Sequence, residues 1–316
     1  MTKKIIARIA NGFGNQMFFY ASVYSFSKKL NYELYLDTFT AINQLKRKNT
    51  KKKFKHWDPK FELNIFNISS KILSKNLTFD SNLGYFKRKF LIFLDNFYSK
   101  KTFYIENINK NIKKSFDINF LDKPFNDKMY IEGYFESEKY FLQFRSELLK
   151  EFSFKKKINC DQEYLNNIVN SNSVSLAIRR DRFSETLNDD LNNKKIIKSK
   201  LFDKLQIDYI NNSIIYFKKK LPNPKFFLFS DNFDGLEDLF YSNENITFVK
   251  NSVQNKVIED FFLMYKCKHF AVAPTSFHWW AAWLNNNDDK ICLRPSNDFL
   301  NPSNSADFWP DSWIKI

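Results

Sequence analysis

Glycine is scarce in this sequence. The 316 residues include 5 glycines, whereas an average usage of about 7% would give roughly 22. Two of the five, Gly12 and Gly14, lie in the segment 11–15, between a short apolar run and a helical pattern. We expect a tight turn here, and the free N–H groups at the start of the following helix suit a phosphate or a sugar oxygen. The alternative is a strand-to-helix turn that binds nothing. The third glycine of the dinucleotide fingerprint is absent, which excludes an NAD site of that type.

Cysteine, long apolar runs and an export signal are also lacking. The three cysteines, Cys160, Cys267 and Cys292, form no C-x-x-C pair, so a disulfide framework is not expected. No apolar run reaches the roughly 18 residues that a membrane-spanning helix needs. The first residues enter a strand-like run without an export signal. These absences predict a soluble, cytoplasmic protein.

Recognisable metal-binding patterns are missing as well. Cys267, His269, His278 and Cys292 lie close in sequence, but their spacing matches no zinc site. There is no D-x-D motif, so the diphosphate-chelating metal site of many sugar transferases is absent. We therefore expect no metal and no cofactor.

Positive charge is abundant. Lys and Arg number 50 against 35 Asp and Glu, which gives a formal net charge of +15. The densest run, from Lys46 to Lys60, holds eight basic residues and one acid, Asp58. Such a surface attracts nucleic acid, acidic lipid headgroups or phosphorylated substrates; the alternative is a lysine-rich composition that only keeps the protein soluble. No helix-turn-helix, RNP or zinc-finger spacing accompanies the charge, so nucleic acid is not an expected partner.

Aromatic residues make up 18% of the chain, which indicates a large buried core. Residues 4–37 read as strand, turn, helix and strand, the start of an α/β domain with a parallel sheet. Residues 40–125 are rich in Lys and Phe and show few clean periods, so we expect irregular helices and loops there. A second alternation of strands and helices begins at Ser173. The sequence therefore predicts two α/β domains, 1–172 and 173–316.

Polar side chains follow three of the strands expected in the second domain. Arg179 and Arg180 follow the first, Asp231 follows the second, and Thr275 and Ser276 follow the last. Open α/β sheets bind ligands at these carboxyl ends. One guanidinium can hold a diphosphate and stabilise it as a leaving group while its neighbour braces the loop. The aspartate can accept hydrogen bonds from a base or ribose, and the hydroxyls can donate to phosphate. The alternatives are solvated arginines, a turn aspartate and a helix cap.

Four segments, in order, are similar to motifs of a known family. Residues 11–20, NGFGNQMFFY, resemble G-x-G-N-Q-M-F-x-Y. Residues 227–232, FLFSDN, resemble F-S-D-D, and residues 273–284, APTSFHWWAAWL, resemble N-S-T-F-S-W-W-A-A-W-L. Residues 295–313 resemble a closing P…D-x-x-P-x-x-W. The family with these motifs is the α-1,2-fucosyltransferases, glycosyltransferase family 11, and the resemblance spans nearly the whole chain.

One further motif of the family is altered. Its H-x-R-R-x-D stands here as AIRRDR, residues 177–182. Both arginines align, but Ala177 replaces the histidine, and Arg182 takes the aspartate position with Asp181 one residue early. In related fucosyltransferases the histidine helps to hold the guanosine of the donor. The change therefore bears on donor affinity and on the identity of the nucleotide.

The resemblance implies a two-domain α/β fold of the GT-B type, with Rossmann-like domains facing a donor cleft. It assigns the acceptor to the N-terminal domain and the nucleotide sugar to the C-terminal one. The implied reaction is inverting transfer of L-fucose from GDP-β-L-fucose to the 2-hydroxyl of a galactoside in a surface glycan, without metal. The implied catalytic residues are Arg179 and Arg180. The implied donor-binding residues are Gly12, Gly14, Asn15, Gln16, Asp231, Thr275, Ser276 and Phe277.

The residues leave three points open. The reaction needs a base near the acceptor hydroxyl, for which Asp37 is a candidate, although a turn residue at a strand end is the alternative. Another nucleotide sugar can be the donor, or the chain can be a non-catalytic saccharide- or anion-binding relative, given the altered motif. If the acceptor is built on a lipid carrier, the run from Lys46 to Lys60 suits peripheral contact with the anionic inner face of the cytoplasmic membrane.

Overall fold

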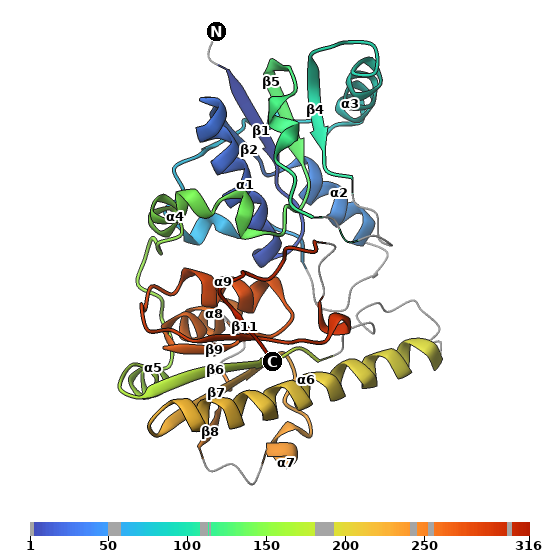
Figure 1. Ribbon diagram of the computed structural model, residues 1–316. Helices are drawn as coiled ribbons and strands as arrows, with labels where there is room; N and C mark the ends of the chain where they lie inside the picture. The colour runs from blue at the N-terminus through green and yellow to red at the C-terminus, as the bar shows by residue number, and fades with distance from the viewer. Residues whose placement is uncertain are drawn as a thin grey trace. The chain divides into compact units, whose positions relative to one another are not determined.

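The computed structural model describes residues 3–49, 58–107, 113, 115–180, 193–240, 245–251, 256–301 and 305–316. The chain forms two compact units. Unit 1 comprises Met1–Lys155 and Ser303–Pro310, and unit 2 comprises Lys156–Pro302 and Asp311–Ile316. Each is built on a parallel sheet with helices (Figure 1), which is the α/β class that the sequence predicts.

The division between the units differs from the predicted boundary at 172/173. Helix α5 (Gln162–Val169) packs against strand β6 (Asn172–Ile178) and therefore belongs to unit 2. Near the end of the chain, Asp307 returns to unit 1: its carboxylate accepts the Phe116 N–H at 2.6 Å and forms an ion pair with Lys139. Side-chain contacts distant in sequence set both boundaries, which explains why composition did not reveal them.

The sheet of unit 1 has five strands in the order β3-β2-β1-β5-β4. Its strands are β1 (Lys4–Arg8), β2 (Glu33–Asp37), β3 (Lys71–Ile72), β4 (Lys101–Ile105) and β5 (Phe125–Glu132). Its helices are α1 (Phe13–Leu30), α2 (Thr40–Asn49), α3 (Asn82–Leu94) and α4 (Arg145–Glu151), with short 3₁₀ turns η1 (Leu63–Ile65), η2 (Lys75–Leu77), η3 (Asn119–Asp122), η4 (Glu138–Tyr140) and η5 (Leu142–Phe144). The central strand β1 pairs in parallel with β2 and β5, so their carboxyl ends lie at one edge.

Helix α1 is the buried centre of unit 1. It begins after Gly12, is followed by Asn31 in the left-handed conformation (φ 55°), and is buried on nearly all sides. The ring of Phe26 meets those of Phe120, Phe135 and Tyr140 edge-on, with centroids 5.1 to 5.8 Å apart. Edge-to-face packing of this kind stabilises a core beyond the area that it buries. Much of the aromatic content of the sequence is therefore packed around this helix.

The region 40–125 is more regular than expected. It contains helices α2 and α3 and strands β3 and β4, where the sequence predicted irregular helices and loops. Helix α3, in the sequence NLGYFKRKFLIFL, has apolar residues on every side. A helix with apolar residues on two opposite sides gives no clear 3.6-residue period, so its pattern was not recognisable.

The sheet of unit 2 has six strands in the order β11-β10-β9-β6-β7-β8, all parallel. Besides β6, they are β7 (Pro224–Ser230), β8 (Ile246–Phe248), β9 (His269–Ala271), β10 (Cys292–Arg294) and β11 (Ile314–Lys315). The helices are α5, α6 (Asn193–Lys220), α7 (Leu236–Phe240), α8 (Lys256–Lys266) and α9 (Ser276–Leu284), with the 3₁₀ turn η6 (Asp298–Leu300). The core is the buried face of β6 and β7 against α6. None of the helices in the described ranges is long and apolar enough to cross a membrane.

Candidate functional site

The polar residues that the sequence singled out in unit 2 lie at one edge of its sheet. Strand β6 is flanked by β9 and β7, and the register pairs Ile178 with Ser230. Arg179, Asp231 and Thr275 follow the carboxyl ends of these three neighbouring strands. The structure therefore brings the predicted residues of this unit to the edge where α/β sheets bind their ligands.

Arg180 is a bracing residue. Its Nε lies 3.3 Å from a carboxylate oxygen of Asp203, and its Nη1 donates to the Asp234 carbonyl at 3.0 Å. Its backbone N–H donates to the Asp231 carboxylate at 2.8 Å. The side chain thus ties the end of β6 to α6 and to the turn after β7. One of the two adjacent arginines therefore braces the loop, as the sequence predicted.

Arg179 is fixed through its backbone. The amide of Gln206, a buried residue of α6, accepts the Arg179 N–H at 3.0 Å and donates to the Arg179 carbonyl at 2.8 Å. Both backbone groups at the strand end are therefore satisfied by one side chain. This clamp holds the Cα of Arg179 at the sheet edge, from which a guanidinium can meet a diphosphate.

The turn from β9 into α9 is held by Thr275 and His278. The Thr275 hydroxyl accepts the His278 N–H at 3.2 Å and caps the helix. The imidazole Nδ1 accepts the Ala273 N–H at 2.9 Å, so the neutral ring carries its proton on Nε2 and donates to the Ser175 hydroxyl at 2.9 Å. Burial lowers the pKa of His278 to about 3. The threonine hydroxyl therefore acts as a helix cap, the alternative given above.

Ser276 and Phe277 open helix α9 and are half-buried. The Phe277 ring packs edge-on against Phe261 of α8, with centroids 5.3 Å apart. The first N–H groups of α9 remain the groups of this segment that suit a phosphate.

The other predicted donor residues, in the turn 12–16, lie in unit 1. Gly12 precedes α1 in an extended conformation, Gly14 is buried in its first turn, and Asn15 is half-buried. Gln16 is fully buried: its amide donates to the carbonyls of Asn11 (2.8 Å) and Lys60 (2.7 Å), and its carbonyl accepts the Glu62 N–H at 3.0 Å. The prediction that Gln16 contacts the donor needs correction, because both amide hydrogens already bind the protein.

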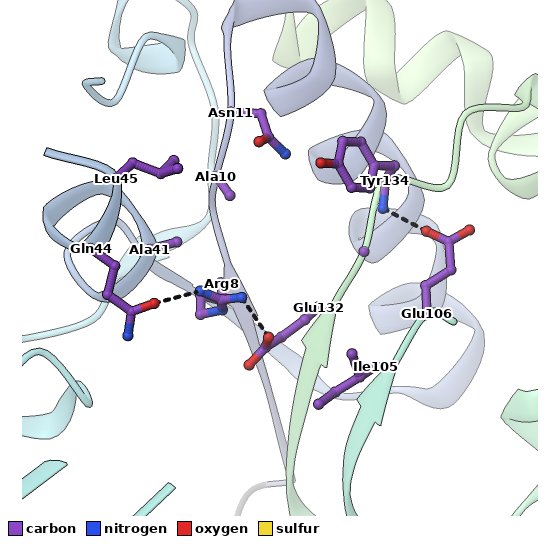
Figure 2. A pocket seen from close by; sticks show the side chains of 11 residues that line it. Arg8, Ala10, Asn11, Ala41, Gln44, Leu45, Ile105, Glu106, Glu132 and Tyr134 are labelled. Carbon is purple, nitrogen blue, oxygen red and sulfur yellow. Dashed lines mark hydrogen bonds and ion pairs between the residues drawn. The ribbon is translucent and has the colours of Figure 1, made fainter. Parts of the chain in front are cut away.

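A pocket of about 250 Å³ opens at the carboxyl edge of the sheet of unit 1 (Figure 2). Its walls come from the ends of β1, β4 and β5 and from α2. They are formed by Arg8, Ala10, Asn11, Ala41, Gln44, Leu45, Ile105, Glu106, Glu132, Gly133 and Tyr134. The volume lies just below the roughly 300–1,000 Å³ of pockets for drug-sized ligands, so one sugar ring is a suitable occupant.

The charges of this pocket are largely balanced. The buried Glu132 carboxylate binds Arg8 Nη2 at 2.6 Å on one oxygen and Arg88 Nη2 at 2.6 Å on the other. Arg8 also donates to the Gln44 side chain at 3.5 Å, as Figure 2 shows. A wall of paired charges and amides suits the hydroxyls of a neutral sugar better than it suits an anion.

Glu106 shapes the opposite wall of the pocket. One of its carboxylate oxygens accepts the N–H groups of Tyr134 (2.6 Å) and Phe135 (3.1 Å), and Figure 2 shows the first of these bonds. Phe135 is held at a positive φ of 48°, a strained conformation for a bulky residue. A Cβ on Gly133 would come within 2.7 Å of the Glu106 side chain, so only glycine permits this close approach.

Sequence reasoning missed this pocket. The informative signal was a charged residue at the carboxyl end of each of two strands, directly after an apolar segment: Arg8 in β1 and Glu132 in β5. Charges at such positions in a sheet are paired or functional. The candidate base Asp37 has a structural role instead. Its buried carboxylate accepts the N–H groups of Phe39 and Thr40 and the Thr40 hydroxyl, at 2.6 to 3.0 Å. It caps the turn into α2, which confirms the alternative and corrects the hypothesis of a base.

Some of the predicted features lie outside the described residues. These are Asp181 and Arg182 of the altered motif and positions 50–57 of the run from Lys46 to Lys60. Within the ranges that the structure describes, no three His, Cys, Asp or Glu side chains gather as metal ligands do. The three cysteines are buried free thiols.

Comparison with known proteins identifies the family. The chain is 30% identical to an α-1,2-colitosyltransferase of Escherichia coli, over 99% of this chain and 98% of that protein. It is 26% identical to the O-antigen biosynthesis glycosyltransferase WbnK of Escherichia coli, over 98% of this chain and 99% of that protein. Among solved structures, it is similar to Arabidopsis thaliana FUT1 with GDP, with a TM-score of 0.49 and 14% identity over 99% of this chain and 76% of that chain. It is also similar to the α-1,6-fucosyltransferase NodZ soaked with GDP-fucose, with a TM-score of 0.47 and 13% identity over 96% of this chain and 97% of that chain.

The model of the family described as glycosyl transferase family 11 matches residues 39–316. This match covers the altered motif, the strand ends of unit 2 and the closing segment. The resemblance drawn from the motifs is thereby confirmed, and with it the α/β, GT-B-type fold class and the general activity of a glycosyltransferase. The chain belongs to glycosyl transferase family 11.

Proposed function

We propose that this protein transfers L-fucose from GDP-β-L-fucose to the 2-hydroxyl of a galactoside in a surface glycan, with inversion and without a metal. The observation that carries the proposal is the backbone clamp on Arg179 beside Thr275 and Asp231, at the carboxyl edge of the sheet of unit 2. The relative that is an α-1,2-colitosyltransferase supports the linkage, since it shares 30% of its residues over nearly the full length.

The departing diphosphate needs positive charge in the transition state. We assign this task to the Arg179 guanidinium, which can bind two phosphate oxygens at once. The N–H groups at the start of α9 add partial positive charge at the same edge. Arg180 keeps the loop in place through Asp203 and Asp234. These groups supply what a divalent cation supplies in other sugar transferases, so we expect transfer to persist in excess chelator.

The pocket of unit 1 is the proposed acceptor site. Its size and balanced charge suit one neutral pyranose, and its Arg8, Asn11 and Gln44 side chains suit sugar hydroxyls. Of its two carboxylates, Glu132 binds arginines through both oxygens, whereas Glu106 accepts the Tyr134 and Phe135 N–H groups on one oxygen, Oε2. Asp37, by contrast, uses both oxygens in its turn and does not line the pocket. We therefore assign Glu106 as the base that removes the proton of the acceptor hydroxyl.

Glu106→Gln tests this assignment. Glutamine keeps an oxygen that can accept the Tyr134 N–H but has no basicity, so kcat should fall roughly 10²–10⁴-fold with little change in the unfolding temperature. The matched change Asp127→Asn near the opposite end of β5, where Asp127 is exposed, should leave kcat unaltered. A Glu106→Gln enzyme with normal kcat would remove Glu106 from the mechanism.

A second donor is favoured by a specific observation. The 30%-identical relative is a colitosyltransferase, and colitose is fucose without its 3-hydroxyl. Ala177, which stands where the family has histidine, also bears on donor choice. A GDP-linked deoxysugar other than fucose is therefore the alternative substrate.

A panel of nucleotide sugars distinguishes these readings. The purified protein is incubated with GDP-fucose, GDP-colitose, GDP-mannose and UDP-galactose, each with methyl β-galactoside, and the released nucleotide is measured. We expect the highest kcat/KM with GDP-fucose and no product from a 2-deoxygalactoside. If GDP raises the unfolding temperature but no sugar is transferred, the protein is a non-catalytic binding relative.

We also propose that the enzyme works at the cytoplasmic face of the membrane. A surface glycan assembled on a lipid carrier is reached at the cytoplasmic face of the membrane, and the basic run from Lys46 to Lys60 suits electrostatic contact with anionic headgroups there.

A further inference from the structure

Helix α3 is apolar on two opposite faces, and the protein covers only one of them. The inner face lies against the edge strand β4 (Figure 1). Leu91 and Ile92 pack against the buried cluster of Phe79, Phe103 and Tyr130. Gly84 approaches the same cluster so closely that a Cβ would lie 2.9 Å from the backbone of Phe79. The orientation of α3 is therefore fixed by close packing on this side.

The outer face carries a continuous apolar stripe. The α3 stripe is defined by side chains spaced three, four and three residues apart along one side of the helix, together with Phe97 in the turn after it, whose ring lies 5.1 Å from that of Phe93. Its members are Leu83, Phe86, Phe90, Phe93 and Phe97, and their exposed fractions lie between 56% and 79%. Isolated exposed apolar residues are ordinary, but an aligned set of this size marks an interaction surface.

Positive charge borders the α3 stripe. Lys87, Lys89 and Lys100 are exposed, and the helix itself contains no acidic residue. The acids at its two ends are engaged. Asp80 pairs with Arg47 at 3.2 Å, and the Asp95 carboxylate accepts the N–H groups of two residues of β4 at 2.7 to 2.9 Å. The surface around the stripe is therefore basic.

We propose that the α3 stripe seats unit 1 on an anionic phospholipid bilayer, with the phenylalanine rings among the headgroups and the lysines on the phosphates. Large apolar side chains flanked by lysine are the composition of helices that lie in a membrane interface. A second copy of the chain is the less suitable occupant, because a symmetric contact would bring the lysines of both copies together. The residues of this surface are not those of the run 46–60, and only its purpose, access to a lipid-linked acceptor, rests on the proposed function.

Vesicle flotation of the full chain tests the proposal. The vesicles are phosphatidylcholine alone, or phosphatidylcholine with roughly one-third phosphatidylglycerol. The stripe variant replaces Phe86, Phe90 and Phe93 with serine. The matched control likewise introduces serine at three apolar positions of unit 2 that are exposed to a similar degree: Ile197, Ile215 and Leu239. Transfer to a soluble galactoside and sedimentation without lipid are measured for every protein.

The wild type and the control should float with the anionic vesicles, and the stripe variant should bind at least tenfold more weakly while keeping its transfer rate. Replacing Lys87, Lys89 and Lys100 with glutamine should remove the part of the binding that salt weakens. A wild type that ignores anionic vesicles, or a stripe variant that floats as well as the wild type, would overturn the proposal. So would a wild-type dimer that the stripe variant abolishes. If flotation behaves as expected but no protein transfers sugar, only the proposed function fails.

Discussion

Arg179 and Arg180 are adjacent, yet the contacts around them differ. Arg180 is held by Asp203 and by the Asp234 carbonyl, whereas Arg179 is positioned by the clamp of Gln206 on its backbone. We predict that Arg179→Lys costs about 2–4 kcal/mol of transition-state stabilisation, because an ammonium cannot imitate the bidentate guanidinium. Arg180→Lys should mainly lower the unfolding temperature.

Steady-state kinetics and thermal unfolding of both variants separate these effects. The matched control is Arg145→Lys, at the start of α4 in unit 1, which should change neither quantity strongly. Equal, minor losses of activity for both members of the pair would contradict the assignment.

His278 gives a prediction about pH. Its folded-state pKa is lowered by burial to about 3, from an ordinary value of 6.5. The unfolded chain therefore takes up a proton below pH 6.5 that the folded chain refuses, and the free energy of unfolding falls by about 1.4 kcal/mol per pH unit between pH 6.5 and 3. In His278→Asn, whose side-chain oxygen can still accept the Ala273 N–H, this loss should be absent.

Urea unfolding at pH 7 and pH 5 checks this prediction. The stability gap between the wild type and His278→Asn should narrow by about 2 kcal/mol at the lower pH. His269→Asn gives a second test in the same direction, because burial also lowers the pKa of His269 and its Nδ1 also accepts a backbone N–H, that of Ile291. An unchanged gap would show that His278 is not the neutral group described here.

At the scale of single residues, strand ends were the informative positions in the sequence. Arg179, Asp231 and Thr275 were predictable because parallel strands present their carboxyl ends at one edge. The role of Gln16 was not, because its partners Lys60 and Glu62 are fixed by the path of the chain. The contacts of Asp37 with Phe39 and Thr40 are local, and they match the alternative of a turn residue at a strand end.

At the scale of elements, the start of α1 gives a further prediction. Gln16→Met keeps the volume of the side chain but leaves the carbonyls of Asn11 and Lys60 and the Glu62 N–H without this partner. Because buried polar groups without partners are costly, we expect a loss of about 2–4 kcal/mol in the free energy of unfolding. Denaturant unfolding measures it. A raised KM for the donor at unchanged stability would instead restore Gln16 to the donor site.

The elements that the sequence predicted best are those with contrasting faces or uniform burial. The strand, helix and strand of residues 4–37 and the strands around Arg179 were recognisable by period and run length. Helix α3 was not, since its two faces are both apolar. The apolar outer face of α3 made the helix hard to recognise in the sequence, and the same face is the candidate surface for a membrane.

At the scale of the whole molecule, the family membership and the two α/β units follow from motifs that span the chain. The boundary at 155/156 and the return of residues 303–310 to unit 1 depend on contacts such as that of Asp307 with Phe116. Such contacts join positions far apart in sequence, so local patterns could not have placed them.

We propose that Arg179 and its neighbours at the sheet edge support metal-free, inverting transfer to a 2-hydroxyl. The most direct test is NMR analysis of the product formed from GDP-β-L-fucose and methyl β-galactoside in excess EDTA. We expect a new α-linked fucose on O2 of the galactoside, formed at the rate seen without chelator. A β-linked product, a linkage to another hydroxyl, or activity that is lost in EDTA and restored by Mn²⁺ would contradict it.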